Sequence, residues 1–150
     1  MSRIHGLMLP VFALAIVAMG AGQVTAQRSR GLMPRWDGDL ASAQFVEVRD
    51  RSGQVILHGA LKTTRDSAKE LEREADLMSP VGEPGKGDVD IEISRKDGVA
   101  TKHEIEVEVE HLPALLDYEV FVDGRVIGSL VTSKKGKGEL ELEWKGASSR

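Results

Sequence analysis

Acidic side chains recur at every second position in three segments of this chain. They alternate with apolar residues, a pattern typical of a half-buried β-strand that carries its acids on one face. The segments contain Asp88, Asp90 and Glu92; Glu104, Glu106, Glu108 and Glu110; and Glu139, Glu141 and Glu143. Grouped carboxylates can bind calcium or a cationic partner, although calcium prefers about six to eight oxygens in a compact site. Three interpretations stay open: a solvated face, a surface for a protein partner and a cation site.

Two of the acidic segments are expected to pair with each other. If residues 88–95 and 102–111 form a hairpin, two rows of carboxylates lie opposite each other on one surface. Like charges placed opposite each other cost about 0.2–1 kcal/mol per pair, so something should offset them. Candidates are Arg49, Lys62 and Arg125 on neighbouring strands, a bound cation, or a cationic partner.

Other residues that could do chemistry lack the required arrangement. His103 and His111 share a face of one predicted strand, but at roughly 3.3 Å per residue about 26 Å separates them, too far to bind one ion. The segments Gly85-Lys86-Gly87 and Gly136-Lys137-Gly138 are too short for a phosphate loop and lead into strands rather than helices. The chain has no cysteine and no G-x-S-x-G segment. We therefore predict that the protein is not an enzyme, with no catalytic, cofactor-binding or metal-ligating residues and no cofactor.

The acidic segments belong to a longer pattern that occurs twice. Residues 85–93 and 136–144 each begin with Gly-Lys-Gly and continue as alternating acidic and apolar residues. Residues 59–63 and 128–132 precede the two copies and also resemble each other. The first copy carries 18 more residues between flank and turn than the second, within residues 64–82. The repeat predicts an internal duplication.

The strand candidates follow one another about every ten residues and predict an all-β domain. Asp123-Gly124 is the strongest hairpin turn, because a type I′ turn needs two residues that accept positive φ. Short strands at this spacing predict a seven- to eight-stranded antiparallel β-sandwich or a small barrel. The strand candidates are 44–49, 54–63, 88–95, 102–111, 118–122, 125–132 and 138–144.

The segment 67–78 fits two structures equally well. Ala68, Leu71, Ala75 and Met78 have helical spacing, and Ser67 with Glu70 forms a capping box. Residues at 71, 73, 75 and 77 also alternate as they would in a strand. A short helix and an eighth strand therefore both stay open.

Residues 112–122 resemble the corner before the penultimate strand of fibronectin type III and other immunoglobulin-like domains. Leu112 stands six positions before Tyr118, which begins an alternating strand. The resemblance implies that the Tyr118 hydroxyl bonds back to the upstream backbone at the crossover between sheets. It implies no binding residues, because this architecture serves many unrelated functions.

The first residues have the features of a secretory signal. Arg3 precedes an apolar core, and Val24-Thr25-Ala26 is a small-x-small cleavage site, so we predict a signal peptide at 1–26 and export to the periplasm or beyond. Removing Arg3 takes the net charge from −4 to −5, which argues against nucleic acid as a partner. The remaining chain is expected to comprise a flexible segment at 27–41, one β-sandwich domain at 42–146 and a disordered tail at 147–150.

These expectations combine into a functional prediction. The protein is expected to be a non-catalytic binding or structural module of the bacterial envelope, with a possible envelope or extracellular protein partner. The alternative is a periplasmic cation or small-ligand binder that uses an acidic sheet face. No integral membrane span is expected after signal cleavage, because the apolar core of residues 7–19 is shorter than the roughly 20 residues that a span needs.

Overall fold

The computed structural model describes residues 38–145 and shows an all-β domain. The predicted signal peptide, most of the 27–41 segment and the predicted tail lie outside the described residues. The described chain forms nine strands: β1 (Phe45–Arg49), β2 (Val55–Ala60), β3 (Lys62–Asp66), β4 (Glu70–Met78), β5 (Lys86–Lys96), β6 (Val99–Glu110), β7 (Asp117–Val122), β8 (Arg125–Val131) and β9 (Gly138–Lys145).

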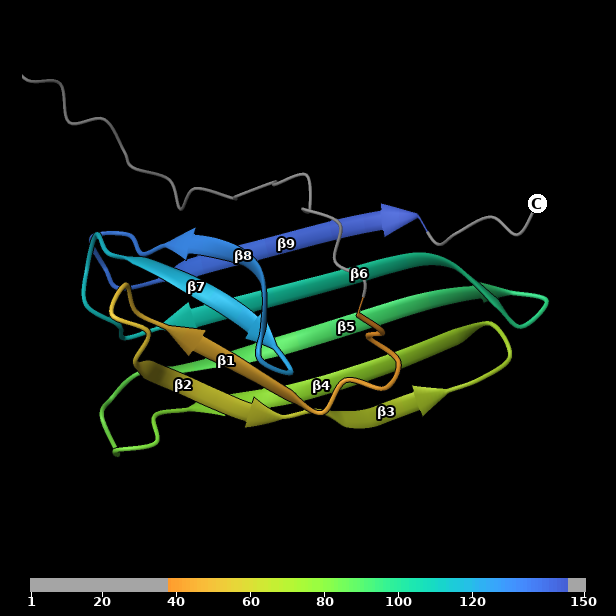
Figure 1. Ribbon diagram of the computed structural model, residues 1–150, viewed down its shortest axis with the longest axis horizontal. Coiled ribbons are helices and arrows are strands. Elements are labelled where there is room, and N and C mark those ends of the chain that lie inside the picture. The colour runs from red at the N-terminus through yellow and green to blue at the C-terminus, as the bar shows by residue number, and fades with distance from the viewer. Residues whose placement is uncertain (1–37, 146–150) are drawn as a thin grey trace, which may run out of the picture.

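The strands form one antiparallel sheet that curls back on itself (Figure 1). Its order is β8-β7-β1-β2-β4-β5-β6-β9, and β3 pairs with β4 beside this path. The two end strands meet through side chains: Gly128 of β8 faces Leu140, and Gly138 of β9 faces Leu130. The all-β, antiparallel prediction is confirmed, and the sheet is a nearly closed barrel.

Strict alternation along the strands explains where the core lies. Apolar side chains point inward from every strand except β3, and each large one that is fully buried contributes about 1.5–3 kcal/mol. β5 contributes Val89, Ile91 and Ile93 to the core, and β6 contributes Ile105, Val107 and Val109. The polar residues between them are left on the outer surface.

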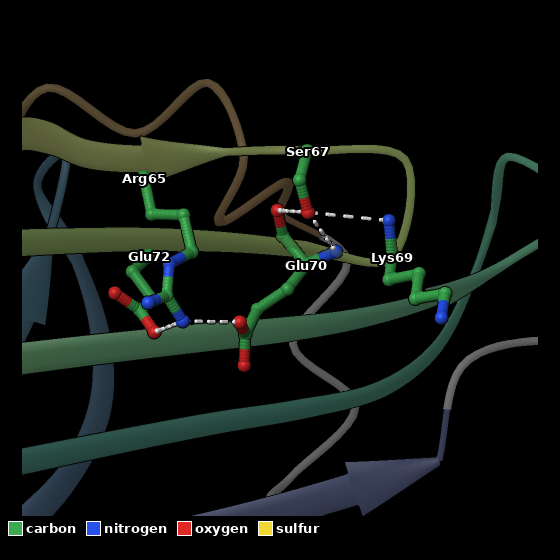
Figure 2. Close-up of polar contacts among 5 residues, drawn as sticks. All are labelled: Arg65, Ser67, Lys69, Glu70 and Glu72. Atoms are coloured by element: carbon green, nitrogen blue, oxygen red, sulfur yellow. Dashed lines mark hydrogen bonds and ion pairs between the residues drawn. The ribbon is translucent and has the colours of Figure 1, made fainter.

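The segment that fitted both a helix and a strand is β4, so the helical alternative is wrong. Ser67 and Glu70 do interact, but they close the β3–β4 turn instead of capping a helix (Figure 2). The Ser67 N–H donates to the Glu70 carbonyl, and Ser67 Oγ accepts from the Glu70 N–H at 3.0 Å. Beyond the turn, nine residues of β4 pair with β5, and this long-range ladder selects the strand.

The predicted strand at 54–63 is divided into two at Leu61. The Leu61 N–H donates to the Gln44 carbonyl, and its side chain is buried. Before this point β2 pairs with β1, and after it β3 pairs with β4. The chain therefore changes neighbours here, which raises the number of strands from the predicted seven or eight to nine.

The Asp123-Gly124 turn has the predicted backbone conformation. Asp123 and Gly124 have φ angles of 46° and 76°. The Asp123 carboxylate also accepts hydrogen bonds from the N–H groups of Gln44 and Phe45 at 2.9 Å. Asp123 thus forms the β7–β8 turn and also binds the backbone at the start of β1.

The corner between β6 and β7 is held by Thr132, which is 1% exposed. Its hydroxyl donates to the Pro113 carbonyl at 2.7 Å and accepts from the Leu116 N–H at 3.0 Å. Tyr118 is also buried, and this burial raises the pKa of its hydroxyl, with a smaller contribution from Asp50. The implied role of Tyr118 in an immunoglobulin-like corner stays a prediction.

A buried arginine binds the segment that precedes β1 through hydrogen bonds to its backbone carbonyls. Arg73 points inward from β4 and is 6% exposed. One guanidinium nitrogen, Nη1, donates to the carbonyls of Leu40, Ala41 and Ala43, and Nη2 donates to that of Leu61. Leu40 and Ala43 then fill part of the core, so the last residues of the 27–41 segment pack against the barrel.

We predict that Arg73→Leu lowers the free energy of unfolding by about 2–5 kcal/mol. The change removes the donor from four carbonyls, and hydrogen bonds to charged groups contribute about 1.5–3 kcal/mol each. Part of this loss is recovered when water reaches the released segment. Urea denaturation with an unchanged slope would measure the loss.

The matched control is Arg65→Leu, on the exposed strand β3. Arg65 binds Glu70 and Glu72 at the surface, where ion pairs contribute little. We expect a much smaller loss of stability for this variant. Equal losses for the two variants would contradict the anchoring role of Arg73.

Candidate functional site

Four neighbouring strands place their carboxylates side by side on the outer surface of the sheet. The pairing of β4, β5, β6 and β9 keeps one register through this region, so acids face acids on every strand. The result is three rows of four, which we call the acidic face. The rows are Glu72, Glu92, Glu104 and Glu143; Glu74, Asp90, Glu106 and Glu141; and Asp76, Asp88, Glu108 and Glu139.

The two rows predicted to face each other on β5 and β6 are confirmed. Asp88 lies opposite Glu108, and Asp90 lies opposite Glu106. The three acids of β4 were missed, because segment 67–78 could not be assigned to a strand from sequence. The alternation of Leu71, Arg73, Ala75 and Leu77 was the available signal for them.

The acidic face is a flat lattice and not a cup. Neighbouring strands lie about 4.8 Å apart, and side chains on one face repeat about every 6.7 Å along a strand. Two open depressions mark this surface, one of them between Glu74, Asp90 and Glu106. Within residues 38–145, no group of three or more acidic or histidine side chains is arranged to hold a metal ion.

Cations meet the acidic face at its borders. Lys102 Nζ lies 2.7 Å from Glu104 and 3.3 Å from Glu143. On the other side, Arg65 Nη1 lies 2.7 Å from Glu70 and 2.8 Å from Glu72, as Figure 2 shows. Of the cations predicted to offset the carboxylates, Arg49 instead binds Glu47 and stacks over Phe121.

The repeated Gly-Lys-Gly segments converge on one carboxylate. β5 and β9 pair with opposite edges of β6, so the two copies lie on either side of its end. There both Lys86 and Lys137 form ion pairs with Glu110. The pairing with Lys137 holds the pKa of Glu110 below its usual value. The lysines of the repeat thus place positive charge at one end of the acidic face.

Two carboxylates within the acidic face, Glu106 and Asp88, have pKa values shifted in the opposite direction. The pKa of Glu106 is raised, first by burial among its neighbours and then by the charges of Glu139 and Glu108. The pKa of Asp88 is raised by burial and then by Asp90. Burial, with a further contribution from neighbouring negative charge, therefore makes these two groups easier to protonate. The same negative charge favours any positive charge that can reach them.

The two histidines of β6 and its end do not form a site together. His103 stacks on Trp144 with ring centroids 5.1 Å apart, at the end of the inner apolar stripe. Its Nδ1 is buried without a hydrogen-bond partner, and burial lowers its pKa. His111 lies beyond the end of β6 with a φ of 60°. The two histidines therefore lie in separate surroundings and do not form a shared site.

Comparison with known proteins assigns no family to the chain. A scan of family models, a search of curated proteins and a search of solved structures each return no match. Among residues 38–145, no helix has the length and apolar character to cross a membrane. The functional argument therefore rests on the acidic face itself.

We predict that Glu106→Gln stabilises the protein at neutral pH by about 0.4–2 kcal/mol, because Glu106 lies opposite both Asp90 and Glu141 and each like-charged pair costs about 0.2–1 kcal/mol. The folded state raises the pKa of Glu106 above its ordinary value of 4.5, so between these two values the folded protein binds more protons than the unfolded chain. In this window, stability should fall as the pH rises, and the variant should weaken that dependence. Thermal melts across the window would measure it.

The control is Glu119→Gln, on β7 and away from the acidic face. It should leave the pH dependence of the melting temperature as it is in the unmodified protein. A steeper loss of stability in Glu106→Gln as the pH rises would contradict the role of charge repulsion.

Proposed function

We propose that the protein is an exported, non-catalytic binding module whose acidic face recognises a positively charged partner at the bacterial envelope. The three rows of carboxylates support this proposal most strongly. They concentrate negative charge on four adjacent strands, and their register repeats at a fixed spacing. A partner with several lysines or arginines along an extended surface fits such a lattice.

The arrangement favours recognition over catalysis. Carboxyl groups that act as general acids or bases usually work in closed sites, where water is excluded and two groups have different surroundings. Here the acids share one open surface, and the neighbours of Glu106 are further acids. Such a surface speeds association with cations by steering them from a distance.

The pattern at the amino terminus supports export, and the topology supports the predicted duplication. Strands β1, β2 and β5 of the first copy correspond in order to β7, β8 and β9 of the second. The two copies are joined where β1 pairs with β7. The additional strands β3 and β4 occupy the stretch where the first copy is longer. We regard the nearly closed barrel as a flattened sandwich, with β8-β7-β1-β2 facing β4-β5-β6-β9 (Figure 1).

Titration with an oligolysine peptide tests the proposed function. A variant of the middle row, with Glu74, Glu106 and Glu141 changed to Gln and Asp90 to Asn, should lose at least tenfold in affinity. Binding to the unmodified protein should weaken as salt is raised, because screening reduces attraction between exposed charges. Isothermal titration calorimetry would measure both effects.

A second variant carries the same charge change away from the acidic face. It replaces Glu47, Glu83 and Glu119 by Gln and Asp97 by Asn, and it should bind nearly as the unmodified protein does. Equal losses in the two variants would show that net charge alone attracts the peptide. A rise in melting temperature with calcium, abolished in the middle-row variant, would instead support the alternative of a cation binder.

A further inference from the structure

One end of the barrel has three neighbouring loops, and two of them present apolar side chains to solvent. We call residues 79–85, 111–116 and 132–137 the loop end; they join β4 to β5, β6 to β7 and β8 to β9 (Figure 1). Exposed here are Val81, Leu115 and Leu116, at 68%, 57% and 49%. They are among the most exposed large apolar side chains of residues 38–145.

The three loops are packed and hydrogen-bonded together. The Leu112 N–H donates to the Gly136 carbonyl, and the Leu115 N–H donates to the Thr132 carbonyl. A Cβ at Gly85 would lie 2.6 Å from the Leu112 side chain, so loops 79–85 and 111–116 are in close contact. The loops that carry the exposed apolar residues are therefore in contact with one another.

Leu115 occupies a conformation that does not suit leucine. Its φ of 59° lies in the left-handed region, which bulky side chains avoid and which Asn or Gly adopts more readily. The side chain is 57% exposed, so burial does not compensate for this strain. Strained residues of this kind cluster at functional sites.

Lysines outnumber acids on the loop end, which carries Lys134, Lys135 and Lys137 against the single acid Glu83. Lys134 and Lys135 are exposed on the loop that bonds to the Leu115 corner. Lys137, the last residue of the loop end, and Lys86, directly after loop 79–85, both form ion pairs with Glu110 at the end of β6. Binding to an anionic lipid surface has two components, the burial of apolar side chains and the attraction of lysines to lipid charges. The loop end supplies both.

We propose that the loop end docks on an anionic membrane surface. Val81, Leu115 and Leu116 enter the boundary between headgroups and acyl chains, and Lys134 and Lys135 contact lipid phosphates. The apolar side chains stand on projecting loops, and a bilayer needs no matching groove to receive them. Lys86 and Lys137 offset the charge of Glu110, the residue of β6 next to the loop end.

Co-sedimentation with vesicles tests this proposal on the protein without its signal segment. It should bind vesicles that contain phosphatidylglycerol and not vesicles of phosphatidylcholine alone. The double change Lys134→Glu and Lys135→Glu should weaken binding at least about 25-fold, because each lysine near an anionic surface contributes a factor of about five. Raised salt should weaken it as well.

Leu115→Asn separates docking from folding. Asn accepts the backbone conformation at this position, so the melting temperature should stay equal or rise while vesicle binding falls severalfold. The matched controls are Val99→Asn and Lys96→Glu, beside the β5–β6 turn at the opposite end of the barrel (Figure 1). Val99 is 44% exposed, and both controls should bind as the unmodified protein does.

Three outcomes would overturn the proposal. They are equal binding to both kinds of vesicle, the absence of binding to either, and equal losses in the controls and the loop-end variants. Capture of a soluble envelope protein through Leu115, without binding to vesicles, would assign the loop end to a protein partner instead.

Discussion

The in-register pairing of β4, β5, β6 and β9 is the constraint on which both the core and the acidic face depend. Side chains alternate strictly along a strand, so one register places Val89, Ile91 and Ile105 inside and all neighbouring acids outside. A slip by one residue would bury carboxylates and expose the core. Burial of the apolar residues therefore maintains the repulsive contacts between acids on the other side of the same strands.

Much of this architecture could be predicted from local patterns. The alternating segments identified β5, β6 and β9, and Asp123-Gly124 identified the turn between β7 and β8, because those signals lie within a few residues of one another. The opposing rows of β5 and β6 followed from a short hairpin. These features need no knowledge of distant contacts.

The features that escaped prediction depend on residues far apart in the chain. Segment 67–78 satisfies both periodicities, and its pairing with β5 selects the strand. Arg73 lies in an alternating run as if it were a core residue, but its buried charge requires the carbonyls of Leu40, Ala41 and Ala43, some thirty residues earlier. The near closure of the sheet likewise follows from the positions of all nine strands together.

The meeting of β8 and β9 gives the barrel a seam. Most neighbouring strands of the path are joined by hydrogen-bonded ladders, although β2 and β4 pair at the single position of His58 and Met78. At the seam, Leu130 and Leu140 pack against Gly138 and Gly128. A boundary held by side chains opens at lower cost than a ladder, so we expect the seam to open before fully paired strands separate. Its opening would free two strand edges at once and offer them to another copy of the chain. Gly128 and Gly138 allow Leu140 and Leu130 to pack at the seam. This packing keeps the two strand edges covered and so disfavours strand exchange.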